Sequence, residues 1–437
     1  MSIPVVTVGQ SREDLVGGLE RLHGPVTVVR RCGELAELLA ACQSGLARAA
    51  VVAEGAGELT ASLVDRLAAV GVSVVALSDD PGEARRLRSI GVVTASLEVD
   101  SATLASKISE AVGQLPGQGR RRAEPRDSGY ADTAAELRPA DASEEPEPVP
   151  TGAGRIVAVW GPTGAPGRTL VAVNIAAELA AEGKSVVLLD ADSYGASVAA
   201  SLGLLDESAG LAQACRLADQ GLLDAESLKR IATPVFAKGT SFRVLTGITR
   251  PDRWTELRAA ALSSVLELAK EIADIVVVDA GFCLEADEEL SFDTMAPRRN
   301  AATLRSLELA DTVYAVGAAD AIGVPRLVRG LAELERAVPH AAPRVVLNKV
   351  RAASAGRSPE RELREAWERY GPGHSIEVFL PSDPGACDTG LLSGAVLFEA
   401  APESALRLAI AKMVCAPVQQ IRKSSVIYSR ARRSLKR

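Results

Sequence analysis

The sequence predicts an α/β protein with two separate sheets, and three observations lead to this expectation. Short apolar segments such as VVAL and IVVVD alternate with amphipathic stretches, which is typical of parallel strands covered by helices on both faces. The chain has 437 residues, more than one core usually holds. Finally, residues 116–153 contain almost no large apolar side chain and divide the alternating pattern into two parts.

The first part, residues 1–115, predicts a small doubly wound unit with five strands, in the segments PVVTVG, VTVVR, AAVVAE, VSVVALSD and VVTASLEV. It resembles a response-regulator receiver. However, Glu54 stands where the phosphoacceptor Asp is expected, and no Lys follows VVTAS. Asp79 and Asp80 are expected to cap a helix that begins at Pro81. These departures favour a pseudo-receiver that docks protein partners over a phosphorylated switch.

Residues 116–153 predict a disordered polar linker, because Pro, Gly, Ala and charged residues dominate there and cannot bury a core. Residues 154–416 then predict a larger unit. Seven apolar segments alternate with helical ones and indicate a twisted, mainly parallel sheet. The sequence between Pro384 and Ala416 predicts helices that close over this sheet.

A glycine-rich turn follows the first strand of the larger unit. The order of strand, glycine loop and helix lets backbone N–H groups converge on phosphate oxygens at the positive end of a helix. A Thr at position 169 places a hydroxyl where Mg²⁺ binds, and a cation at position 168 reaches toward phosphate. The predicted nucleotide-binding residues of the loop are Gly161, Gly164, Ala165, Pro166, Gly167, Arg168, Thr169 and Leu170.

Acidic residues end two further strands of this unit. Asp190 and Asp192 close the segment SVVLLDAD, and Asp279 closes DIVVVDAG. Carboxylates at the C-terminal ends of neighbouring parallel strands point into one crevice, where they can order Mg²⁺ and its waters. Any single one of them is also explained as a cap at a strand end. Together with the glycine loop they predict a nucleotide site.

The order of these motifs, followed by LNKV and a late FLPSDPGACDTG segment, resembles the ParA/MinD family of deviant Walker A ATPases. The resemblance covers about residues 155–415 and implies a P-loop NTPase domain that binds ATP and Mg²⁺ and forms a homodimer. With a receiver-like unit before the linker, the chain looks most like the CpaE/TadZ branch, which localises pilus assembly machinery and includes septum-site regulators.

The resemblance also implies roles for single residues. Thr169, Asp190 and Asp279 would hold Mg²⁺, and Asp192 would lie near the attacking water. Asn348 would read the adenine edge, although a strand-end turn residue explains it equally well. Lys349, Pro381 and Asp383 would line the pocket for the adenine base.

Two departures from the family pattern bear on turnover. The signature Lys that crosses to the partner's phosphates is Thr163 in this chain, and the P-loop Lys is Arg168. An Arg keeps the charge but not the point geometry of an ammonium group. Because a cation on the transferred phosphate supplies much of the rate, Asp192 and Arg168 are candidate catalytic residues of a slow or inactive ATPase.

The net charge of −7 argues against a surface that contacts nucleic acid or anionic lipid throughout. Residues 417–437 form a basic tail, for which weak anionic-lipid or DNA contact and simple solvation are both open. No apolar run is long enough for a transmembrane segment, and six scattered Cys and three His predict neither a disulfide framework nor a zinc site. We expect a cytoplasmic protein, with polar, septal or membrane-associated placement open.

These observations predict a cytoplasmic, ATP-binding spatial regulator that dimerises and positions pilus assembly, septum or envelope machinery, with protein partners bound through residues 1–115. Two alternatives stay open at this stage. One is a non-enzymatic scaffold with a degenerate nucleotide site, and the other is a chromosome- or plasmid-partitioning ATPase.

Overall fold

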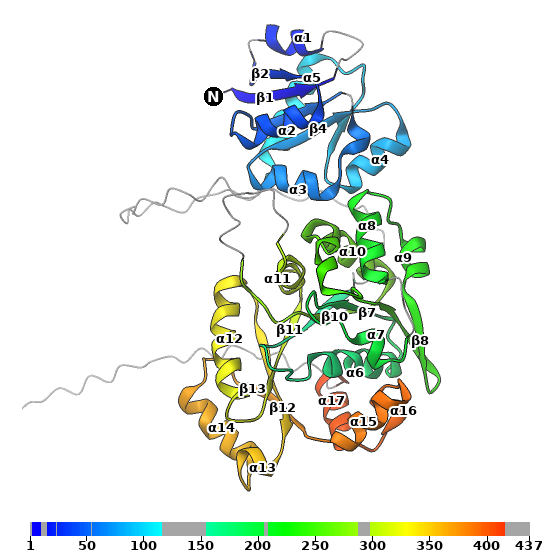
Figure 1. Cartoon of the computed structure of the whole chain (residues 1–437). Coiled ribbons are helices and arrows are strands. Elements are labelled where there is room, and N and C mark those ends of the chain that lie inside the picture. The colour runs from blue at the N-terminus through cyan, green and yellow to red at the C-terminus, as the bar shows by residue number, and fades with distance from the viewer. Residues whose placement is uncertain are drawn as a thin grey trace, which may run out of the picture.

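The computed structural model describes residues 2–9, 15–22, 24–53, 55–115, 154–204, 209–286 and 298–415. Three sequence-based predictions lie outside the described residues: the linker, the basic tail, and Glu54 at the end of the third strand. The remaining chain forms two units, each built on its own sheet (Figure 1).

The first unit has the five strands that the sequence predicts, in the order β2-β1-β3-β4-β5 and all parallel. This is the order of a doubly wound sheet of the flavodoxin type. Its helices cover both faces. Its elements are β1 (Ile3–Val8), α1 (Leu15–Arg21), β2 (Val26–Cys32), α2 (Leu35–Gln43), β3 (Ala49–Val52), η1 (Ala56–Glu58), α3 (Ala61–Ala69), β4 (Ser73–Leu77), α4 (Pro81–Ser89), β5 (Val93–Ala95) and α5 (Ser101–Gly113).

The two aspartates after β4 have different roles. Asp80 caps α4 as predicted, and its side chain accepts a hydrogen bond from the Gly82 N–H at 2.9 Å. Asp79 does not cap the helix. Its carboxylate instead accepts from the Ser96 hydroxyl and the Leu97 N–H, at 2.7 and 2.9 Å, and so ties the end of β4 to the loop after β5.

The second unit has an eight-stranded sheet in the order β13-β12-β11-β6-β10-β7-β9-β8. Seven strands are parallel. The eighth, β8, runs antiparallel to β9 at one edge and was not predicted, because the short TPVFA segment lacks a buried continuous apolar run. The strands are β6 (Arg155–Trp160), β7 (Val186–Ala191), β8 (Thr233–Ala237), β9 (Thr240–Leu245), β10 (Ile275–Ala280), β11 (Thr312–Ala318), β12 (Pro343–Val350) and β13 (Ile376–Pro381).

Helices cover both faces of this sheet (Figure 1). One face packs against α6, α16 and α17, and the other packs against α8, α10, α11 and α12. The helical elements are α6 (Arg168–Ala181), α7 (Val198–Ser201), α8 (Gly210–Asp219), α9 (Ala225–Ile231), η2 (Pro251–Glu256), α10 (Ala259–Ile272), α11 (Ala301–Glu308), α12 (Gly323–Ala337), α13 (Ala352–Ala355), α14 (Pro359–Tyr370), α15 (Pro384–Ser393), α16 (Leu397–Ala400) and α17 (Ala405–Cys415).

The prediction of an α/β fold with mainly parallel sheets is therefore confirmed. Strand residues alternate between the two faces, as a sheet covered on both sides requires. In β10, for example, Val277 faces the α6 side, whereas Val276 and Val278 face the α10 side. Within the described residues, no helix is long and apolar enough to cross a membrane.

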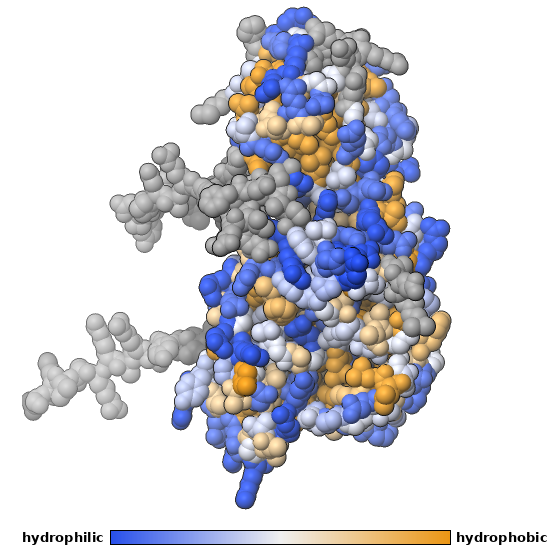
Figure 2. All heavy atoms as spheres, viewed as in Figure 1, coloured by the Kyte–Doolittle hydropathy of each residue, from blue (hydrophilic) through white to orange (hydrophobic). Residues whose placement is uncertain are grey.

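The two units meet where α3 and α4 of the first unit lie over α8 and α10 of the second (Figure 1). The Ser62 N–H donates to Asp219 at 2.8 Å, and an Arg86 guanidinium nitrogen donates to the Gln220 carbonyl at 3.1 Å. Ala260 of α10 packs against the apolar core of the first unit. Hydrophilic residues gather on the surface at this junction (Figure 2).

A buried ion pair fixes α17 on α6. Arg407 of α17 makes two hydrogen bonds to the Glu178 carboxylate of α6, at 2.6 and 2.7 Å. The Glu178 side chain is only 3% exposed, so its charge depends on this partner. Burial is also the main reason why the pKa of Glu178 is raised, against the opposing effect of Arg407.

We predict that Arg407→Ala lowers the free energy of unfolding of the second unit by about 3 to 5 kcal/mol, because it leaves a buried carboxylate unpaired. Arg361→Ala is the matched control. Arg361 pairs with Glu365 at 3.7 Å, both side chains are exposed, and the expected loss is below about 1 kcal/mol. Urea denaturation measures both, and equal losses in the two variants would contradict the prediction.

Candidate functional site

The candidate site lies at the C-terminal ends of three adjacent central strands, β6, β10 and β7. The glycine loop leaves β6, and Asp279 and Asp190 lie near the ends of β10 and β7. These two aspartates are direct register partners in the parallel ladder, which brings their side chains to the same edge of the sheet. Ligands of open α/β sheets bind at this kind of edge. The acids and the loop thus lie at the same edge of the sheet, and their sharing one nucleotide crevice stays a prediction.

The loop from Gly161 to Gly167 needs its glycines. Gly164 and Gly167 have φ angles of 108° and 98°, which residues with a Cβ atom rarely adopt. Ala165 between them lies in the left-handed region at φ 52° despite its side chain. At Gly161 a Cβ would collide with the Val316 carbonyl of the neighbouring strand. Backbone strain at a non-glycine residue is often found at ligand sites.

The end of this loop offers hydrogen-bond donors to an anion. Helix α6 begins at Arg168, and its first N–H groups have no acceptor within the helix. No described residue accepts a hydrogen bond from the backbone N–H of Gly167, Arg168 or Thr169. Leu170 packs its side chain into the core below. The positive end of α6 and these N–H groups have the arrangement that binds phosphate oxygens in other proteins.

Thr169 and Asp279 meet beside the loop. The Thr169 hydroxyl donates to Asp279 Oδ2 at 2.6 Å and accepts from the Ser197 hydroxyl at 3.1 Å. The other oxygen, Asp279 Oδ1, is buried, and no described group donates to it. A buried carboxylate oxygen without a donor, next to two hydroxyl groups, fits a cation with oxygen ligands.

This corner fits Mg²⁺ better than a metal held by protein alone. Among the described residues, no group of three His, Cys, Asp or Glu side chains is placed to hold a metal. Mg²⁺ needs no such cage, because it keeps several waters and is bound by one or two carboxylates together with substrate phosphates. Thr169 and Asp279 would hold it, and the bound ion would neutralise phosphate charge.

Asp190 is as deeply buried as Asp279. Its carboxylate is 1% exposed and accepts hydrogen bonds from the N–H groups of Val198 and Asp192, at 2.9 and 3.3 Å. Burial raises the pKa of Asp190 to about 7. Burial also raises the pKa of Asp279, and the nearby Asp190 charge adds to this effect. Two carboxyl groups with raised pKa values at one edge are typical of a site that a cation completes.

Arg168 has a different setting from the one expected. We predicted that its side chain reaches phosphate. In the structure one guanidinium nitrogen donates to Asp192 Oδ2 at 2.9 Å, and another donates to the Gly161 carbonyl at 3.1 Å. Both members of the Arg168–Asp192 pair are largely buried, with side chains 12% and 6% exposed. The charge of Arg168 is thus balanced within the protein, and its contact with phosphate stays a prediction.

Asn348 and Lys349 both contact the glycine loop. Asn348 Nδ2 donates to the Pro166 carbonyl at 2.8 Å, and Lys349 Nζ donates to the Ala165 carbonyl at 2.8 Å. Lys349 itself has a φ of 61°. These two residues therefore brace the loop from the end of β12. A role in reading an adenine base is a prediction that no contact in this structure tests.

The predicted wall residues of β13 lie farther along the same edge. Pro381 ends β13 and pairs with Val350 of β12. Asp383 caps α15, because its carboxylate accepts from the Ala386 N–H at 3.1 Å. It also accepts from the Ser404 hydroxyl at 2.7 Å, which lowers its pKa. These contacts give Asp383 a structural role, and its contact with a base stays a prediction.

Sequence reasoning missed Ser197 and Tyr194. Ser197 reaches Thr169 from the start of α7, and Tyr194 donates its hydroxyl to Asn300 at 2.8 Å. The guanidinium of Arg299 stacks 4.0 Å from the Tyr194 ring centroid. The sequence feature that could have pointed to Ser197 and Tyr194 is the polar DSYGAS segment, which directly follows the strand of Asp190. These contacts join the loop after β7 to the residues that precede α11.

Comparison with known proteins is informative for part of this unit. Residues 152–234 match the family model described as ParA: NUBPL iron-transfer P-loop NTPase. The matched segment contains the glycine loop, Thr169, Asp190 and Asp192. From here on we refer to this loop as the P-loop and to residues 154–415 as the P-loop domain. No curated protein sequence matches the chain.

Solved structures with a similar fold include the following three proteins. The cell division ATPase MinD of Pyrococcus furiosus is 19% identical, with 60% of this chain and 97% of that chain covered and a TM-score of 0.46. The ParA family ATPase from Chlorobium tepidum TLS is 18% identical, with 60% and 99% covered and a TM-score of 0.47. The septum site-determining protein MinD from Pyrococcus horikoshii OT3, complexed with Mg-ADP, is 18% identical, with 60% and 94% covered and a TM-score of 0.45.

The raised pKa values of the buried carboxyl groups predict how stability depends on pH. Between about pH 4 and pH 7 the folded protein holds a proton on Asp190 that the unfolded chain releases, so stability falls as pH rises through this range. We expect the melting temperature, measured in EDTA without nucleotide, to fall over this range. Asp190→Asn should flatten the fall, and an unchanged slope would contradict the assignment.

Proposed function

We propose that this protein is an ATP-binding spatial regulator that dimerises through its P-loop domain and positions envelope machinery, with slow or absent ATP hydrolysis. The observation that carries the nucleotide part is the Thr169–Asp279 corner. It combines a hydroxyl, a buried carboxylate oxygen without a donor, and backbone N–H groups without acceptors among the described residues. Mg²⁺ would contact the carboxylate oxygen of Asp279, and the phosphates of ATP would accept hydrogen bonds from the N–H groups.

The proposal of slow hydrolysis is supported by two positions in the P-loop. Thr163 stands where the family resemblance implies a Lys, and Arg168 is paired with Asp192. A cation that contacts the transferred phosphate supplies orders of magnitude in rate, so a P-loop with a neutral residue and a paired Arg lacks that contribution. Nucleotide binding does not need this cation, because the backbone N–H groups and Mg²⁺ can still contact the phosphates.

The positioning role is supported by the order of the two units. A small doubly wound unit without receiver chemistry precedes the P-loop domain, and this order resembles the CpaE/TadZ branch, whose members act on pilus and septum machinery. The assignment of pilus, septum or other envelope machinery is part of the proposal. Partner binding through residues 1–115 is proposed with it.

One observation favours a second candidate, a non-enzymatic scaffold with a degenerate nucleotide site. The Arg168 guanidinium is paired with Asp192 and also donates to the Gly161 and Pro162 carbonyls at the start of the loop. If this pair does not open, the loop keeps its shape without a nucleotide. Nucleotide binding therefore distinguishes the two candidates.

We predict that ATP with Mg²⁺ raises the melting temperature, because a ligand of the folded state stabilises it by mass action. At a concentration about 100 times the dissociation constant the gain is about 2.7 kcal/mol. Asp279→Asn and Thr169→Ala should each abolish the Mg²⁺-dependent part of the shift. Asp252→Asn, an exposed acid outside the site, is the matched control. The absence of any shift in the unmodified protein would favour the scaffold.

A second prediction concerns turnover. Thr163→Lys restores a cation at the position that the family resemblance assigns to phosphate contact, so we expect it to raise the rate of ATP hydrolysis at least about tenfold. Thr163→Gln has a similar length without the charge and should leave the rate unchanged. Phosphate release under saturating ATP measures both. If Lys and Gln give equal rates, charge at position 163 does not limit turnover.

A further inference from the structure

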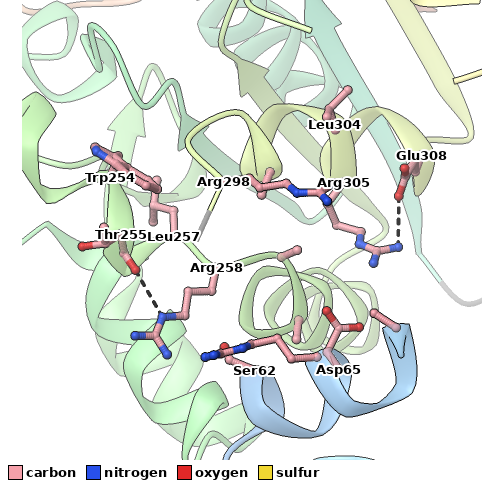
Figure 3. Close-up of a pocket in the computed structure, with 15 residues that line it drawn as sticks. Ser62, Asp65, Trp254, Thr255, Leu257, Arg258, Arg298, Leu304, Arg305 and Glu308 are labelled. Carbon is pink, nitrogen blue, oxygen red and sulfur yellow. Dashed lines mark hydrogen bonds and ion pairs between the residues drawn. The ribbon is translucent and has the colours of Figure 1, made fainter. Parts of the chain in front are cut away.

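A second cavity lies between the two units, and none of its lining residues belongs to the P-loop. It has a volume of about 320 Å³, within the range of small-molecule sites. Helix α3 of the first unit forms one wall. The other walls come from η2, the start of α10 and α11 of the P-loop domain (Figure 3).

The lining of this cavity carries excess positive charge. Four arginines and two carboxylates line it, so the lining has a formal charge of +2. Figure 3 shows Arg298 and Arg305 on one side of the opening and Arg258 on another. The charged lining residues are Arg66, Arg258, Arg298, Arg305, Asp65 and Glu308.

The arginines keep hydrogen-bond donors available toward the cavity. Arg305 pairs with Glu308 through one terminal nitrogen at 3.0 Å, but its Nε is buried and has no acceptor among the described residues. The contacts of Arg258 are long, at 3.4 Å to the Thr255 carbonyl and 3.5 Å to Asp219. Arg298 is exposed, and its guanidinium has no acceptor among the described residues.

Apolar side chains form the rest of the wall. Trp254, Leu257 and Leu304 line the cavity together with small alanines of α10 and α11. Trp254 and Leu304 are partly exposed, so their apolar surfaces are accessible to a ligand. Guanidinium groups donate paired hydrogen bonds to the oxygens of a phosphate group, whereas the Trp and Leu side chains can pack against an apolar or aromatic part of a ligand. The chemistry of the wall therefore selects a molecule that has both.

We propose that this cavity binds a small organic phosphate dianion with an apolar or aromatic body. Such a ligand would bridge the units, because Arg66 belongs to α3 and the other three arginines belong to the P-loop domain. It would also contact α11. Asn300, the residue before α11, accepts a hydrogen bond from Tyr194 in the loop after Asp192. The ligand site thus lies along a helix whose start contacts the nucleotide-site loops.

Tryptophan fluorescence of the full chain tests the proposal, with phenyl phosphate as the probe. The chain has three Trp residues, and Trp160 and Trp367 are buried at 1% and 5% exposure, so Trp254 is the one that lines the cavity. We expect a saturable change that Trp254→Phe abolishes. Arg298→Gln and Arg305→Gln should each weaken binding about tenfold, since each removes charge-assisted hydrogen bonds.

Three controls make the result specific. Arg361→Gln, an exposed arginine of α14, should leave the affinity unchanged. Thr169→Ala should also leave it unchanged, so that failure of the ATP proposal is distinguishable from failure of this one. Phenol, which lacks the phosphate, should not bind.

Several outcomes would overturn the proposal. They are the absence of a saturable response, an affinity that neither Arg298→Gln nor Arg305→Gln changes, and a response that is lost in Thr169→Ala. Equal affinity for inorganic phosphate would reduce the site to an adventitious ion only. Retained far-UV circular dichroism in both arginine variants ensures that lost binding is not lost folding.

Discussion

The contact between Thr169 and Asp279 is the interaction on which the rest of the site depends. It joins the first turn of α6 to the end of β10 through a 2.6 Å hydrogen bond at the centre of the sheet. The loop before it has its strained geometry because α6 begins here, and Asn348 and Lys349 brace that loop from β12. Asp190 lies beside Asp279 in the ladder. Burial raises the pKa of both carboxyl groups, and the charge of a neighbouring aspartate adds to the effect. A divalent cation would stabilise the ionised carboxylates, and phosphate would accept hydrogen bonds from the N–H groups of the loop.

A second constraint is the pairing of Arg168 with Asp192. It balances two largely buried charges without help from a ligand, and it holds the one cation of the loop next to the loop's own carbonyls. Nucleotide binding and ATP hydrolysis therefore depend on different groups of the same loop region. Binding uses backbone donors and the Thr169–Asp279 corner, whereas turnover needs a cation that contacts phosphate. The nucleotide part of the proposed function, binding with slow or absent hydrolysis, rests on meeting the first of these requirements and not the second.

Much of the fold could be predicted from the sequence because buried parallel strands are continuous apolar runs. IVVVD and VVLLD are such runs, and both ended at the expected carboxylates. The edge strand β8 was missed, since an exposed antiparallel edge carries no such run. Asp79 was misassigned, because the Ser96 and Leu97 groups that it binds lie across the sheet edge and not in the helix that follows. The partner of Arg168 and the cavity between the units depend on tertiary contacts that no local pattern encodes.

The most direct test of the central claim is electron paramagnetic resonance of Mn²⁺, used in place of Mg²⁺, with and without a non-hydrolysable ATP analogue. Asp279 alone is a poor cage, so the account predicts that Mn²⁺ binds at one site per chain only when the analogue is present, and that Thr169→Ala abolishes this binding. Mn²⁺ that binds equally well without the analogue, or not at all with it, would contradict the account.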